Sequence, residues 1–124
     1  MSAPSVLLVD DEPDIRRIAQ LSLGLVGGFR VLLAASGPEA VAAAERERPD
    51  VILLDVMMPG MDGPSTLGQL RLRPSTQSIP VIFMTAKVRR GELDQLASLG
   101  VHGILCKPFD PMTLAHEVRA LLAR

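Results

Sequence analysis

The sequence contains no tryptophan, no tyrosine, three phenylalanines and a single cysteine, Cys106. One cysteine cannot form an internal disulfide, so a disulfide framework is excluded and a reducing, cytoplasmic location is expected. So few aromatic rings weaken any case for stacking on nucleic-acid bases. The formal net charge of −1 provides no basic surface to displace counterions from phosphates, which also argues against nucleic acid as a partner.

Long apolar runs are absent as well. No stretch approaches the ~20 residues needed to cross a bilayer, and the start of the chain lacks the features of a signal peptide. We therefore expect no membrane partner. The length of 124 residues, of which 48% are hydrophobic, suits a single domain over residues 1–124 with a mainly aliphatic core.

Five short apolar runs follow one another along the chain, at residues 6–9, 31–34, 51–54, 81–84 and 101–105. Their apolar character is continuous rather than alternating. This pattern predicts strands that are covered on both faces, as in the interior of a parallel sheet. The fifth run is the weakest, because it includes His102 and Gly103.

The segments between these runs carry helix signals. A first amphipathic helix is predicted between Pro13 and Gly27, with one face formed by residues at helical spacing, namely Ile15, Ile18, Ala19, Ser22 and Val26. A capping box from Ser36 to Glu39 opens a second helix. Residues 63–73, 89–99 and 111–122 suit three more. Strand and helix thus alternate, which predicts an α/β fold with a doubly wound parallel sheet.

Polar residues stand where the apolar runs end. Asp10 and Asp11 follow the first run, Asp55 the third, Thr85 the fourth and Lys107 the fifth. Because ligands of open α/β sheets bind at the carboxyl ends of the strands, we expect these side chains to converge. Crowded carboxylates call for a cation, and oxygen ligands favour Mg²⁺, with Mn²⁺ as an alternative. A nucleophilic carboxylate, an ammonium and a hydroxyl are the groups that phosphoryl transfer needs.

Four motifs combine these residues. They are Leu8-Val9-Asp10-Asp11-Glu12, the run from Leu54-Asp55 to Asp62-Gly63, Met84-Thr85-Ala86 and Lys107-Pro108-Phe109. With these motifs in this order, the sequence resembles the receiver domains of response regulators in two-component signalling, over essentially its whole length. The resemblance implies a flavodoxin-like sheet of five strands in the order 2-1-3-4-5 with five helices. It also implies a signalling switch rather than an enzyme in the usual sense.

The resemblance assigns roles to the acidic residues. Asp55 is expected to accept a phosphoryl group from a histidine kinase or histidine phosphotransfer protein and to change the surface offered to a downstream protein. Asp11 would ligate Mg²⁺ directly and Asp10 largely through water. Asp55 itself and the backbone carbonyl of Met57 would supply further ligands. A monomer or weak dimer is expected.

The resemblance also names phosphoryl-binding and switch positions, which are Thr85, Ala86 and Lys107, and a cis peptide bond before Pro108. The family usually has Tyr or Phe where this chain has Ile104. Because isoleucine has no aromatic ring that could move, the conformational change on activation is expected mainly in residues 57–63 and 85–91. Met57 and Lys87 would flank the path of attacking water, and because neither is a carboxamide or an acid, slow self-hydrolysis of the phosphoryl group is expected.

Simpler interpretations remain open. Asp10 and Asp11 can serve as caps of the following helix, Thr85 as an ordinary strand residue and Lys107 as a surface charge. Cys106 is expected to be buried packing rather than a redox sensor. Two other functions also remain: a metal-dependent phosphohydrolase with an aspartyl-phosphate intermediate, and a docking module that never takes phosphate. The contiguous aspartates Asp10 and Asp11 argue against the phosphohydrolase. The presence of the acidic pair, the acceptor aspartate, the hydroxyl and the lysine together argues against the docking module.

Overall fold

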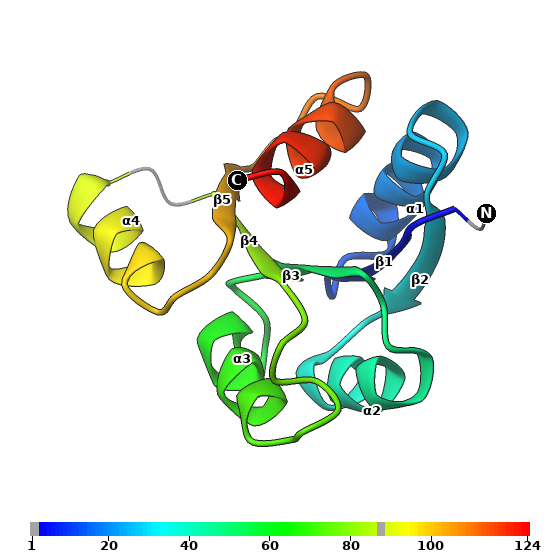
Figure 1. The fold of residues 1–124 in the computed structure, drawn as a ribbon. Coiled ribbons are helices and arrows are strands. Elements are labelled where there is room, and N and C mark those ends of the chain that lie inside the picture. Colours follow the sequence, from blue (N-terminus) through cyan, green and yellow to red (C-terminus); the bar gives the residue numbers. More distant parts are fainter. Residues whose placement is uncertain (1–2, 87–88) are drawn as a thin grey trace.

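The computed structural model describes residues 3–86 and 89–124. Within these ranges the chain forms a five-stranded parallel sheet flanked by helices (Figure 1). The strands are β1 (Ser5–Val9), β2 (Arg30–Ala34), β3 (Val51–Asp55), β4 (Val81–Thr85) and β5 (Gly103–Cys106). The helices are α1 (Pro13–Leu21), the π-helical η1 (Ser22–Val26), α2 (Gly37–Glu47), α3 (Gly63–Arg71), α4 (Arg90–Ala97) and α5 (Leu114–Leu122). The strand order β2-β1-β3-β4-β5 confirms the predicted fold.

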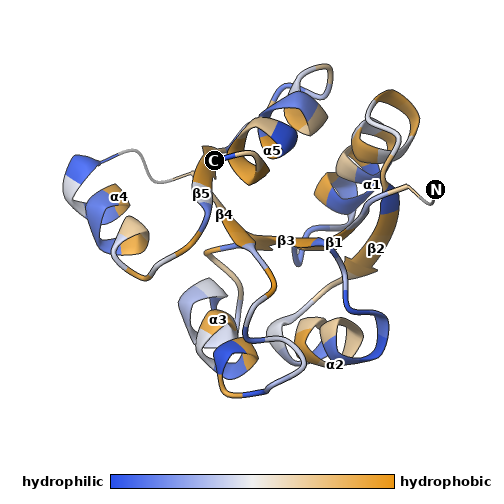
Figure 2. Ribbon diagram, viewed as in Figure 1, coloured by the Kyte–Doolittle hydropathy of each residue, from blue (hydrophilic) through white to orange (hydrophobic). Residues whose placement is uncertain are grey.

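Each face of the sheet has its own hydrophobic core. Leu7 and Val9 of β1 pack in a core that also contains residues of α2, α3 and α4, such as Leu67 and Leu96. Val6 and Leu8 face the other way, toward residues of α1, η1 and α5. Figure 2 shows hydrophobic strands between helices that carry both hydrophilic and hydrophobic residues. Burial on both faces is why the strands read as continuous apolar runs.

Local sequence sets where α2 and α3 begin. The side chain of Ser36 accepts a hydrogen bond from the backbone N–H of Glu39 at 3.3 Å, as the predicted capping box requires. The side chain of Asp62 accepts one from the backbone N–H of Ser65 at 2.8 Å. Each helix also has a proline in its first turn, where no intrahelical donor is needed.

The first helix differs from the prediction. Ala19 and Ser22 of the predicted face are buried, but Ile18 and Val26 are 43% and 53% exposed, and Leu23 is buried instead. The chain changes from α1 to the π-helical η1 at Ser22. A π-helical turn contains more residues than an α-helical one, so Val26, at its end, is rotated away from the position that α-helical spacing predicts.

The last strand is also displaced from its prediction. The apolar run spans residues 101–105, whereas β5 is Gly103–Cys106, because Gly103 is the residue that pairs with Ile82 of β4. Since β5 lies at the edge of the sheet, Cys106 is exposed, which corrects its predicted burial. None of the helices in the described ranges has both the length and the hydrophobicity to span a membrane.

Candidate functional site

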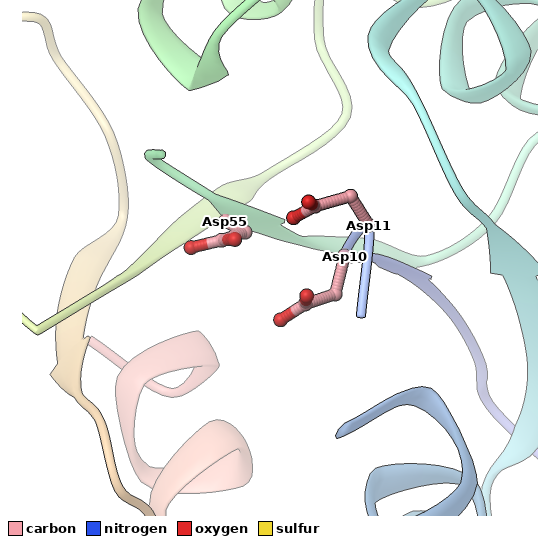
Figure 3. Close-up of side chains that lie close together, drawn as sticks. All are labelled: Asp10, Asp11 and Asp55. Carbon is pink, nitrogen blue, oxygen red and sulfur yellow. The ribbon is translucent and has the colours of Figure 1, made fainter. Parts of the chain in front are cut away.

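Three carboxylates meet where β1 and β3 end (Figure 3). Asp10 and Asp11 follow β1 directly, and Asp55 is the last residue of β3. One oxygen from each lies within 4.8 Å of the other two. The pairing of β1 with β3 explains this convergence, because Val9 lies opposite Leu54 and the next residue of each strand is an aspartate. Asp10 and Asp55 are 0% and 4% exposed. The predicted convergence is confirmed.

Lys107 joins the cluster from the end of β5. Its Nζ atom lies 2.7 Å from Oδ2 of Asp10 and 3.4 Å from Oδ1 of Asp55. Its backbone N–H donates to the carbonyl of Thr85 at 2.8 Å, which ties it to the end of β4. Although burial lowers its pKa, the hydrogen bond to Asp10 and the charges of Asp55 and Asp10 raise the pKa of Lys107 above its ordinary value. The side chain is 14% exposed and contacts two carboxylates, so the simpler interpretation of Lys107 as a surface charge is wrong.

The acidic cluster is short of positive charge. Burial first, and then the charge of Asp10, raise the pKa of Asp55 from 3.8 to about 6, against the lowering effect of Lys107 and of a hydrogen bond from the backbone of Met57. The cluster has three carboxylates and one ammonium, that of Lys107, so the fully ionised set has an excess of two negative charges. A divalent cation with oxygen preference matches both the charge and the ligands, and the residues present fit Mg²⁺.

Asp10 also makes a local hydrogen bond just before α1. Its Oδ1 atom accepts a hydrogen bond from the backbone N–H of Glu12 at 2.9 Å. Glu12 is the N-cap residue of α1 and makes no side-chain capping bond of its own. Neither Asp10 nor Asp11 is therefore the N-cap of α1, and the cap interpretation is wrong. One oxygen of Asp10 closes a local turn before the helix and the other contacts Lys107.

The loop after β3 returns close to Asp55. Gly63 begins α3, and its backbone N–H donates to the carbonyl of Val56 at 2.9 Å. A Cβ atom on Gly63 would lie 2.7 Å from the backbone oxygen of Asp55, so a glycine is needed for this close approach. Met57, at the start of the loop, has a side chain that is 60% exposed.

The remaining predicted positions lie at the ends of β4 and β5. Thr85 ends β4 and is fully buried, and Ala86 follows it at the exposed edge. The Lys107–Pro108 peptide bond is cis, as predicted. Ile104 is half-buried and packs against the core on the α2, α3 and α4 side of the sheet. Lys87 lies outside the described residues.

Sequence reasoning missed Arg16. Its Nη1 atom donates a hydrogen bond to the backbone carbonyl of Asp10 at 2.8 Å. The available signal was a basic residue one helical turn after the aspartate pair, a position from which a long side chain can reach back to the strand end.

Comparison with known proteins identifies the family. The family model for the response regulator receiver domain matches residues 6–119. Response regulator Rre1 of Synechocystis is 43% identical over 120 residues, which is 97% of this chain and 52% of that protein. Response regulator PleD of Caulobacter vibrioides is 42% identical over 118 residues, covering 94% of this chain and 25% of its own length. The chain thus spans about half the length of Rre1 and a quarter of the length of PleD.

Solved structures agree. Chemotaxis protein CheY4 of Vibrio cholerae superposes with a TM-score of 0.88 at 32% identity, covering 97% of this chain and 99% of its own. The receiver domain of sensor histidine kinase PA1611 from Pseudomonas aeruginosa, which has a magnesium ion in its active site cleft, gives a TM-score of 0.86 at 31% identity, covering 99% and 100%. Receiver domains are signalling phosphoacceptors of two-component systems and are not generally classed as enzymes. The chain belongs to the response regulator receiver domain family.

Proposed function

We propose that residues 1–124 form a single receiver domain that accepts a phosphoryl group on Asp55 and thereby changes the surface it offers to a downstream protein. The observation that carries this proposal is the meeting of Asp10, Asp11 and Asp55 within 4.8 Å, with Lys107 3.4 Å from Oδ1 of Asp55. Asp10, Asp11, Asp55 and the backbone carbonyl of Met57 would hold Mg²⁺ or Mn²⁺. The magnesium ion in the Pseudomonas aeruginosa receiver domain supports this assignment.

Asp55 supplies the nucleophile. One of its carboxylate oxygens attacks the phosphorus of a phosphohistidine on a histidine kinase or phosphotransfer protein, so that a P–O bond forms as the P–N bond breaks. The imidazole leaves and takes up a proton from solvent. When bound, the metal ion supplies neutralisation of the charge on the phosphoryl oxygens. Because Asp55 is 4% exposed, the phosphohistidine has to reach it at the edge of the sheet where the strands end.

Lys107 and the end of β4 receive the phosphoryl group. The ammonium of Lys107, which contacts Asp10 and Asp55 in the unmodified protein, turns to a phosphoryl oxygen. The hydroxyl of Thr85 and the backbone N–H of Ala86 donate to the other oxygens, since Thr85 ends the strand that pairs with β3 and Ala86 follows it. The proposed setting is the cytoplasm, with the chain as a monomer or weak dimer and without nucleic-acid or membrane contacts.

A small phosphodonor tests the proposal. The parent, Asp55→Asn and Asp94→Asn are incubated with acetyl phosphate and Mg²⁺, and intact mass is measured over time. Asp94, an exposed residue of α4, is a matched control because its substitution removes the same charge away from the cluster. We expect one phosphoryl adduct on the parent and on Asp94→Asn, and none on Asp55→Asn or in the presence of EDTA.

Three other outcomes would contradict the proposal, each in a different way. An undiminished adduct on Asp55→Asn would overturn the assignment of the acceptor. Rapid release of phosphate with many turnovers and no lasting adduct would indicate a phosphohydrolase. Absence of any adduct on the parent, in a preparation that unfolds cooperatively, would indicate a docking module that takes no phosphate.

A further inference from the structure

Arg16 connects the first turn of α1 to the end of β1. Its Nη1 atom donates a 2.8 Å hydrogen bond to the backbone carbonyl of Asp10. Its backbone N–H donates to the carbonyl of Glu12 at 3.1 Å, which anchors the residue in the helix. Arg16 is half-buried, whereas its neighbour Arg17 is exposed. The two adjacent arginines therefore differ in environment although they have the same charge.

The oxygen that Arg16 contacts belongs to the peptide unit that joins Asp10 to Asp11. A peptide unit is planar from one Cα atom to the next, so holding its oxygen holds the orientation of the whole unit. The directions in which the side chains of Asp10 and Asp11 leave the backbone depend on that orientation. Both carboxylates belong to the acidic cluster, so this one hydrogen bond bears on the relative placement of two of its three members.

The other polar atoms of Asp10 have partners too. Its N–H donates to the carbonyl of Ala34 at 3.1 Å. Its Oδ1 accepts from the N–H of Glu12 at 2.9 Å, and its Oδ2 accepts from Lys107 at 2.7 Å. Phosphorylation would remove one of these contacts, because Lys107 turns to the phosphoryl group. The bond from Arg16 does not depend on Lys107 and remains to hold the peptide unit.

We infer that Arg16 is a positioning residue, which holds the peptide unit between Asp10 and Asp11 so that both carboxylates face the metal ion. It contacts neither the acceptor carboxylate nor the phosphoryl group, and it acts through the backbone. The expected effect of Arg16 on metal binding rests on the proposed function, because the oriented carboxylates are the proposed metal ligands. Its structural part, the orientation of the peptide unit, is measurable without metal or phosphate.

The experiment compares Arg16→Ala and Arg16→Lys with Arg17→Ala, which removes the same charge from an exposed position. Mg²⁺ affinity is measured by calorimetry, and amide chemical shifts are recorded without metal. Substitutions of residues that orient metal ligands typically weaken metal binding 10–100-fold. We expect Arg16→Ala to lose about tenfold in Mg²⁺ affinity and to shift the amides of Asp11 and Glu12. Arg16→Lys should recover part of the affinity, and Arg17→Ala should match the parent.

Several results would overturn the inference. Equal Mg²⁺ affinities in Arg16→Ala and Arg17→Ala would show that the contact does not orient the ligands. Equal losses in both would show a general effect of charge, and no recovery in Arg16→Lys would contradict a role for the donated hydrogen bond. If the parent itself neither binds Mg²⁺ nor takes a phosphoryl group, the proposed function fails. The metal-free amide shifts then still decide whether Arg16 orients the peptide unit.

Discussion

Asp55→Asn is expected to stabilise the metal-free protein at neutral pH even though it removes the proposed phosphoryl acceptor. Burial first, and then the negative charge of Asp10, raise the pKa of Asp55 from 3.8 to about 6. Keeping this carboxylate ionised in the folded state therefore costs free energy. Asparagine has nearly the same shape and no charge, so neither burial nor the charge of Asp10 destabilises it in this way.

The pH dependence follows from the direction of the shift. Asp55 titrates near 3.8 in the unfolded chain and at about 6 in the folded protein. Between these values the folded state binds more protons, so the free energy of unfolding of the parent falls as pH rises. One pKa unit corresponds to about 1.4 kcal/mol, which gives a loss of about 3 kcal/mol above about pH 7. In a domain of this size that loss corresponds to about 10 °C in melting temperature.

Urea unfolding in EDTA measures this difference. Circular dichroism is the suitable probe, because the chain has no tryptophan or tyrosine. Parent and Asp55→Asn should have similar stability near about pH 4 and diverge by about 3 kcal/mol at about pH 8, with the variant more stable. The exposed-site control Asp94→Asn should follow the parent. Saturating Mg²⁺ should narrow the gap, because ligand binding stabilises the folded parent. A difference that is independent of pH, or a less stable Asp55→Asn at about pH 8, would refute the reasoning.

Three further predictions concern metal binding, phosphate lifetime and switching. Asp11→Ala should weaken Mg²⁺ binding by about tenfold or more, because the variant lacks one carboxylate ligand. An unchanged calorimetric titration would count against Asp11 as a ligand. Met57→Asn should shorten the lifetime of the phosphoryl adduct, because an amide can orient water where the exposed Met57 thioether cannot; intact-mass decay curves that coincide with the parent's would contradict this. A phosphoryl mimic with Mg²⁺ should change the amide chemical shifts mainly in residues 57–63 and 85–91. Chemical-shift changes confined to β5 and α5 would show that the conformational change does not occur in those two segments.

The fold was predictable because its strands are buried on both faces. Four apolar runs coincide with β1 to β4 to within a residue or so, since two covering layers of helices leave no polar positions inside these strands. β5 was displaced because its pairing register, with Gly103 opposite Ile82, is set by β4 rather than by its own hydrophobicity. The π-helical η1 was not predictable, because α-helical spacing assumes one constant period.

The acidic site was predictable for a different reason. In a parallel sheet all strands end at the same edge, so Asp10, Asp55 and Lys107 were placed together by their positions after apolar runs alone. For the contact of Arg16 with the backbone, the sequence offered only a basic residue one helical turn after the aspartate pair. The bond from Arg16 to the carbonyl of Asp10 depends on the path of the chain through the first turn of α1, which neither composition nor periodicity specifies.

The position of Lys107 suggests how a modified Asp55 would act on the rest of the domain. In the unmodified protein its ammonium holds Asp10 and Asp55 together, and its backbone N–H is bonded to the carbonyl of Thr85. A shift of Lys107 toward a phosphoryl group would therefore pull on the ends of β4 and β5 at once. On β5 this pull meets Ile104, which lies opposite Phe83 and packs against the core with a β-branched side chain that is stiff at χ1. β4, which lies between β3 and β5 and is buried along its whole length, resists such a displacement. We therefore expect the movement to pass into the segments beyond Asp55 and Thr85, and a partner that reads the switch to contact those loops.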